Sequence, residues 1–89
     1  MTFTLGIVGA GQFGGQFAEL FNSHPAISRV FVTDLIATRA SDLARSANLS
    51  GIHDSFETML ADPQIDAVAI FTQRWSHGPL VVQALRAGK

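Results

Sequence analysis

The sequence contains no cysteine, only three prolines, and 15% charged residues. Without cysteine the chain can form neither disulfides nor thiolate metal sites, and we assign it no metal. Six basic residues stand against seven acidic ones without a basic cluster, so nothing indicates nucleic-acid binding. No apolar run approaches the ~20 residues that a membrane-spanning helix needs. The composition therefore argues against a disulfide-stapled, nucleic-acid-binding or membrane-spanning protein.

The amino terminus also lacks a charged region ahead of an apolar one, which argues against a signal peptide. We therefore expect a cytoplasmic protein. Apolar residues make up 47% of the 89 residues, which is ample for a globular core. A chain of this length forms one domain at most and buries roughly 60% of its unfolded surface. We accordingly interpret residues 1–89 as one domain.

A strand followed by three spaced glycines opens the sequence. Phe3–Val8 is a nearly continuous apolar run, typical of parallel sheets that are covered on both faces. Gly9 then allows a sharp turn whose backbone angles a side chain would forbid. In dinucleotide-binding domains the second glycine, here Gly11, lets a pyrophosphate approach the backbone, and the third, Gly14, lets a helix pack closely on the sheet. The alternative is a glycine-rich turn without a ligand.

The spacing of apolar residues predicts a helix over Gln12–Asn22. Its first N–H groups, those of Gln12 and Phe13 included, lie at the positive end of the helix dipole and are predicted to face phosphates. We expect an apolar stripe of this helix to pack in the core: Phe13, Phe17, Leu20 and Phe21. Gly15 costs about 1 kcal/mol of helix stability relative to alanine, and only close packing or phosphate approach would explain it.

An aspartate closes the second predicted strand, Ile27–Thr33. Asp34 follows Gly14 by about 20 residues, the spacing at which an acid binds the adenosine ribose hydroxyls in this architecture. Its charge repels a 2′-phosphate and therefore favours NAD over NADP, although Arg39 nearby could weaken that discrimination. The alternative is a turn aspartate that faces solvent.

The rest of the chain continues to alternate between helix and strand. We expect a helix over Thr38–Asn48 and a very short strand at Ile52 and His53. Asp54 and Glu57 have the spacing of a capping box, which predicts a short helix over Ser55–Ala61. A buried strand, a loop and a last helix with Pro79 in its first turn follow: Ile65–Phe71, Thr72–His77 and residues 79–88. We assign no function to His24 or His53.

This alternation predicts an α/β fold, a doubly wound parallel sheet of the Rossmann type with strand order 3-2-1-4. Ligands of such sheets bind outside the carboxyl ends of the strands, where the winding reverses between strands one and four. The glycine turn and the Thr72–His77 loop both lie at that point. We therefore predict that Thr72, Gln73 and His77 complete the cofactor site.

Taken together, the chain resembles the N-terminal domain of the glucose–fructose oxidoreductase/inositol dehydrogenase (Gfo/Idh/MocA) family over essentially its whole length. The resemblance rests on the glycine turn of residues 6–14, the strand that ends in Asp34, and two further segments. One is the Asp62–Val68 stretch, close to the family's D-x-x-I-D-A-V pattern. The other is Thr72–His77 followed by Ala84–Lys89. The first two features occur in many dinucleotide domains, whereas the last two are much more specific.

The resemblance implies an NAD(P)-dependent oxidoreductase that transfers a hydride between nicotinamide and a sugar, cyclitol or related polyol. Family members continue into a fifth strand that carries a Glu-Lys-Pro lysine, and into a second domain that binds most of the substrate. We therefore expect a fragment that carries no catalytic residue, in which Lys89 is not the catalytic lysine. For the full-length protein we expect a homo-oligomer.

Two features leave the function open. The family commonly has Thr-Pro where this chain has Thr72-Gln73. Proline would stiffen the loop and remove a donor, whereas glutamine keeps both the freedom of the loop and an amide. His77 either caps the last helix or bonds the loop backbone, or it contacts the cofactor near the nicotinamide ribose. A nucleotide sensor without chemistry is the alternative function, and FAD or S-adenosylmethionine are alternative adenosine ligands. The exposed edge of the last strand would favour self-association.

Overall fold

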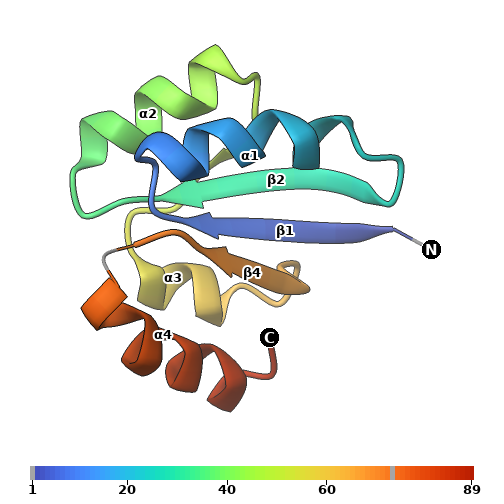
Figure 1. The fold of residues 1–89 in the computed structure, drawn as a ribbon. Coiled ribbons are helices and arrows are strands. Elements are labelled where there is room, and N and C mark those ends of the chain that lie inside the picture. Colours follow the sequence, from blue (N-terminus) through green and yellow to red (C-terminus); the bar gives the residue numbers. More distant parts are fainter. Residues whose placement is uncertain (1, 73) are drawn as a thin grey trace.

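The computed structural model describes residues 2–72 and 74–89, and the side chains of residues 13 and 74–76 lie outside the description. Strands and helices alternate along the chain (Figure 1). The strands are β1 (Phe3–Val8), β2 (Ile27–Thr33), β3 (Gly51–Ile52) and β4 (Ala67–Ile70). The helices are α1 (Gln12–Ser23), α2 (Ala37–Ser46), α3 (Phe56–Ala61) and α4 (Arg74–Arg86). Among the described residues, no helix has the length and apolar character needed to cross a bilayer.

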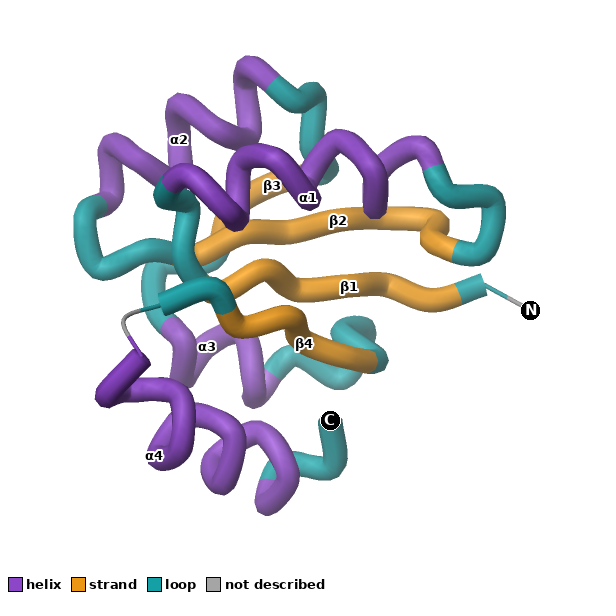
Figure 2. The backbone as a smooth tube through the Cα atoms, viewed as in Figure 1, coloured by secondary structure: helices purple, strands orange, loops and turns teal. Residues whose placement is uncertain are grey.

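The strands form one parallel sheet in the order β3-β2-β1-β4, which confirms the predicted topology. β1 lies inside the sheet, paired with β2 over its whole length and with β4 from Leu5 to Val8. Helices α1 and α2 cover one face, and α3 and α4 cover the other (Figure 1). The loops after β1, β2 and β4 gather at the carboxyl edge of the sheet (Figure 2).

Each face of the sheet has its own apolar cluster, because the side chains of β1 alternate between the faces. Ile7 belongs to the cluster under α1 and α2, and Val8 belongs to the cluster under α3 and α4. The first cluster also contains Ala18, Val30, Val32, Ala40, Leu43 and Ala47. The second also contains Phe56, Met59, Ile65 and Ala84. Because β1 is buried on both faces, its sequence is a nearly continuous apolar run and does not alternate between apolar and polar residues.

The predicted core stripe of α1 is wrong at two positions. Phe17 and Leu20 are 39% and 62% exposed, whereas Ala18 is fully buried. The helix lies so close to the sheet that small residues, Gly14 and Ala18, occupy the contact one turn apart. The larger ring of Phe17 is displaced to the side, where it stacks on Phe71 with centroids 5.4 Å apart.

Several predicted boundaries also differ from the structure. Helix α4 begins at Arg74, so the predicted Thr72–His77 loop is mostly helical and Pro79 lies inside the helix. A proline inside a helix removes one backbone hydrogen bond and crowds the carbonyl four residues earlier, so this interior position is unfavourable and was not the one predicted. The cap of α3 is Ser55 rather than Asp54. Strand β3 and helix α2 each end earlier than predicted, and β4 is shorter at both ends.

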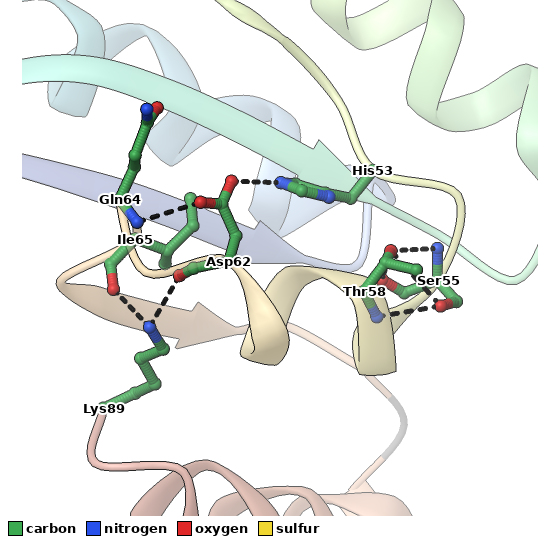
Figure 3. A network of polar contacts seen from close by, with 7 residues as sticks. All are labelled: His53, Ser55, Thr58, Asp62, Gln64, Ile65 and Lys89. Atoms are coloured by element: carbon green, nitrogen blue, oxygen red, sulfur yellow. Dashed lines mark hydrogen bonds and ion pairs between the residues drawn. The ribbon is translucent and has the colours of Figure 1, made fainter.

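A polar network ties the end of α3 to the last residue (Figure 3). Asp62 is the C-cap of α3. One of its carboxylate oxygens lies 3.1 Å from His53 Nε2, and the other accepts a hydrogen bond from the Gln64 amide. The Lys89 ammonium donates to the carbonyl oxygens of Asp62 and Ile65. These carbonyls precede β4, so Lys89 lies at the amino edge of the sheet, opposite the glycine turn.

Candidate functional site

A cleft of about 780 Å³ opens at the carboxyl edge of the sheet, within the size range of small-molecule sites. The turn after β1 and the end of β4 form its floor. Residues 33–36 and 39, from the end of β2 and the start of α2, form one wall. Residues 54–57, at the start of α3, together with Leu80 and Gln83 of α4, form the other. The cleft therefore lies at the predicted reversal of the winding.

The chain's own packing requires two of the three glycines. Gly9 has a φ of +103°, and a Cβ there would lie 2.6 Å from the Phe71 carbonyl oxygen. A Cβ on Gly14 would collide with the carbonyl oxygen of Gly9. Gly11 differs, because a Cβ there would meet no atom within 4 Å. Gly11 lines the cleft, so its missing side chain leaves space beside the backbone for a ligand.

The beginning of α1 has the features of an anion site. Gly11 is the N-cap and provides no side-chain hydrogen bond, and the first turn contains no acidic residue. The first intrahelical bond runs from the Gly15 amide to the Gly11 carbonyl at 2.9 Å. The amides before it lack acceptors within the helix and lie at the positive end of its dipole. Gln12, in this turn, is exposed.

Asp34 lies directly against the glycine turn. One of its carboxylate oxygens accepts the Ala10 amide at 2.7 Å, and the other accepts the Ile36 amide at 2.8 Å. The side chain lines the cleft, and the residue is half-buried. An acid 24 residues away in sequence therefore shares one rim with the glycines.

The wall next to Asp34 combines apolar surface with one cation. Leu35 is fully exposed and Ile36 is nearly half exposed, although both are large apolar residues. Arg39 is exposed on the first turns of α2 and also lines the cleft. Exposed apolar side chains beside a polar rim are typical of a ligand surface.

At the other end of the cleft, Thr72 lines the floor after β4. The His77 Nε2 atom lies 2.7 Å from the Thr72 carbonyl oxygen. A carbonyl only accepts, so Nε2 carries the proton and donates. This contact is the loop-backbone bond that was one of the two interpretations of His77. Gln73 and the side chain of Phe13 lie outside the described residues.

The family model described as "Oxidoreductase family, NAD-binding Rossmann fold" matches residues 3–89. The chain belongs to the Gfo/Idh/MocA family. It is 32% identical to trans-1,2-dihydrobenzene-1,2-diol dehydrogenase of Mus musculus over 100% of this chain and 27% of that protein. It is 33% identical to the NAD(+)-dependent scyllo-inositol 2-dehydrogenase of Bacillus subtilis over 93% of this chain and 25% of that protein.

Solved structures agree with this family assignment. The myo-inositol dehydrogenase of Lactobacillus casei, solved with NAD(H) and myo-inositol, superposes with a TM-score of 0.86 at 28% identity. The superposition covers 97% of this chain and 26% of that one. The chain thus spans about a quarter of the length of the Gfo/Idh/MocA relatives that it matches.

Sequence reasoning missed several residues of this Gfo/Idh/MocA cleft. Ala10 was not singled out, although its amide bonds Asp34. The available signal was its position between the first two glycines of the turn. Leu35 was also missed, and only its place directly after Asp34 would have indicated it. Ser55 and Glu57 were read as helix-start residues alone, yet both line the cleft.

Proposed function

We propose that this chain is the NAD-binding part of an oxidoreductase that acts on a cyclitol, a sugar or a related polyol. The observation that carries the proposal is Gly11, a glycine without a packing reason that opens onto the cleft beside the Asp34 carboxylate. The family supports it, since the model that matches residues 3–89 describes an NAD-binding Rossmann fold. The names of the inositol dehydrogenase relatives support the substrate class.

In this proposal each part of the cleft binds one part of the cofactor. The amides of the first turn of α1, those of Gln12 and Phe13 included, bind the diphosphate. The Gly9 and Ala10 amides do not take part, because they are bonded to the Thr33 carbonyl and the Asp34 carboxylate. Asp34 accepts hydrogen bonds from the adenosine ribose. Leu35 and Ile36 provide an apolar surface for the adenine. Thr72, Gln73 and His77 are assigned to the nicotinamide side, and NAD supplies the hydride acceptor.

The carboxylate of Asp34 also sets the proposed preference for NAD. A 2′-phosphate would bring a second negative charge against it, and like charges at this range repel. Arg39 lies on the same wall and offers a compensating cation, so NADP binds as well but less tightly. Replacement of Arg39 by glutamine should therefore weaken NADP binding more than NAD binding, which titration of both cofactors measures.

The chemistry itself is proposed to require more protein than these residues. No catalytic residue is assigned to residues 1–89, and we propose that the substrate is bound mainly outside them. A protein as long as the relatives is expected to reduce NAD with a polyol, whereas residues 1–89 alone are expected to show no turnover. We further propose that the longer protein is a cytoplasmic homo-oligomer.

The test is calorimetric titration of the protein with NAD, NADP, FAD and S-adenosylmethionine. We expect NAD to bind and the two last ligands not to bind. Gly11→Ala should weaken NAD binding by at least about tenfold without unfolding the chain, because its methyl group occupies ligand space. Gly15→Ala adds the same group four residues later and serves as the matched control.

The outcomes separate the candidate functions. Absence of NAD binding, or full affinity in Gly11→Ala, would contradict the proposed site. NAD binding without polyol oxidation by the full-length protein would favour a nucleotide sensor instead.

A further inference from the structure

We infer that Asp34 has a second role as a positioning residue: its carboxylate holds the glycine turn in the shape that binds a diphosphate. The inference rests on the proposed function and goes beyond ribose recognition. It starts from the two amides that the carboxylate already accepts, one from Ala10 in the turn and one from Ile36.

The two hydrogen bonds join different segments of the chain. The Ala10 amide belongs to the exit of β1, and the Ile36 amide belongs to the exit of β2. The Gly9 amide, one residue before Ala10, donates a hydrogen bond of 2.9 Å to the Thr33 carbonyl. This is the last backbone hydrogen bond between the two strands. Beyond it, no backbone–backbone hydrogen bond among the described residues joins the segment after β1 to the segment after β2. The Asp34 side chain therefore extends the connection one residue further, into the turn itself.

The number of acceptor sites lets one carboxylate serve both roles. An ionised carboxylate offers about four lone-pair sites, two on each oxygen. Ala10 and Ile36 occupy one site on each oxygen. One site on each remains, which matches the two hydroxyl donors of a ribose. Ribose binding then completes the hydrogen bonding of Asp34 without releasing the turn.

Asparagine has the same shape as aspartate but cannot accept both hydrogen bonds. Its side chain ends in one oxygen that accepts and one nitrogen that donates. In Asp34→Asn, either the Ala10 amide or the Ile36 amide would face an NH₂ group. If the NH₂ group faces Ala10, the bond to the turn is lost. If it faces Ile36, the bond to Ala10 remains but is no longer charge-assisted and is about half as strong. The turn is therefore held less firmly in either orientation.

A ligand without ribose hydroxyls separates the two roles. We choose 2′,3′-dideoxyadenosine diphosphate, which keeps the diphosphate and offers no hydroxyl to Asp34. If Asp34 acted on the ribose alone, Asp34→Asn would bind this ligand as well as the wild type or better, because a negative charge near the phosphates is removed. If Asp34 holds the turn, Asp34→Asn binds it more weakly, by about tenfold for one lost charge-assisted hydrogen bond.

Asp54→Asn is the matched charge control. Asp54 is exposed on the opposite wall of the same cleft, and it makes no hydrogen bond to the turn among the described residues. Both variants remove one negative charge from the cleft. We expect only Asp34→Asn to lose affinity for the dideoxy ligand. Equal or increased affinity in Asp34→Asn would overturn the inference.

A second measurement needs no variant. In the ligand-free wild type, the Ala10 amide should exchange with deuterated solvent slowly, because its hydrogen is held by the Asp34 carboxylate. Exchange as fast as in an exposed loop would overturn the inference even if Asp34→Asn failed to fold. Failure of the wild type to bind NAD and ADP would instead contradict the proposed function, so the two failures are distinguishable.

Discussion

At the scale of single residues, two adjacent glycines at the start of α1 are glycine for different reasons. A Cβ on Gly14 would collide with the Gly9 carbonyl oxygen, whereas a Cβ on Gly15 would lie 3.9 Å from Leu43 Cδ1. The second distance is an ordinary van der Waals contact. Alanine therefore fits at position 15 and does not fit at position 14.

Gly15→Ala should raise the free energy of unfolding by about 0.5–1 kcal/mol, because alanine has the higher helix propensity and restricts the unfolded chain. Gly14→Ala should lower it by roughly 1–3 kcal/mol, the usual cost of overpacking, and should weaken NAD binding by moving the turn. Urea unfolding of both variants measures the difference. A destabilised Gly15→Ala, or an unchanged Gly14→Ala, would contradict the packing described for α1.

The sequence predicted the glycine roles only in part. The motif assigned Gly9 to a turn and Gly14 to close packing, and the structure confirms both assignments. Periodicity alone placed Phe17 and Leu20 in the core, and this was wrong. A helical period identifies an apolar face but not the depth of the contact, which here is set by Gly14 and Ala18.

At the scale of elements, the start of α3 shows how a cap decides where a helix begins. The Ser55 hydroxyl accepts the Thr58 amide at 3.1 Å, and the Thr58 hydroxyl accepts the Ser55 amide at 3.2 Å. The sequence offered a second pair with the same spacing, Asp54 and Glu57. The structure uses the Ser55 pair, and the helix that it begins buries Phe56 and Met59.

We predict that Ser55→Ala lowers the free energy of unfolding by about 1 kcal/mol, the usual cost of a lost N-cap. Asp54→Ala, one residue earlier, should change it by less than about 0.5 kcal/mol, as is usual for exposed positions. Thermal unfolding of the two variants tests the assignment. If Asp54→Ala were the more harmful change, the cap would belong to the register that the sequence predicted.

The order of the elements was the most predictable part of the molecule. Strand order and the parallel direction follow from alternating strands and helices with right-handed crossovers. The beginning of α4 was not predictable in this way, because proline favours the first turn of a helix, whereas Pro79 occupies an interior position. The contact between Asp34 and the Ala10 amide depends on tertiary structure, and no local pattern contains it.

At the scale of the whole molecule, apolar surface remains exposed on α4 beside an open sheet edge. Among the described residues β4 pairs with β1 alone, so its outer side carries unpaired backbone groups. Leu85 of α4 is 67% exposed, and Val81 and Val82 are also exposed. Exposed edges and apolar patches promote association between chains.

We predict that residues 1–89, produced alone, self-associate at micromolar concentrations, and that Leu85→Lys reduces the association. Ala87→Lys adds the same charge next to the same helix without removing a large apolar side chain, and should reduce it less. Sedimentation velocity measures the mass of each species. A monodisperse monomer for the unmodified chain would show that these surfaces do not drive association.

The contact between the exits of β1 and β4 has a mechanical consequence. Because the Phe71 carbonyl leaves no room for a side chain on Gly9, the backbone after β4 rests directly on the turn after β1. The two parts of the cleft floor are therefore in backbone contact, with no side chain between them. We expect a shift of the backbone at Thr72 to displace the turn at Gly9 directly, which would couple the two ends of the cleft.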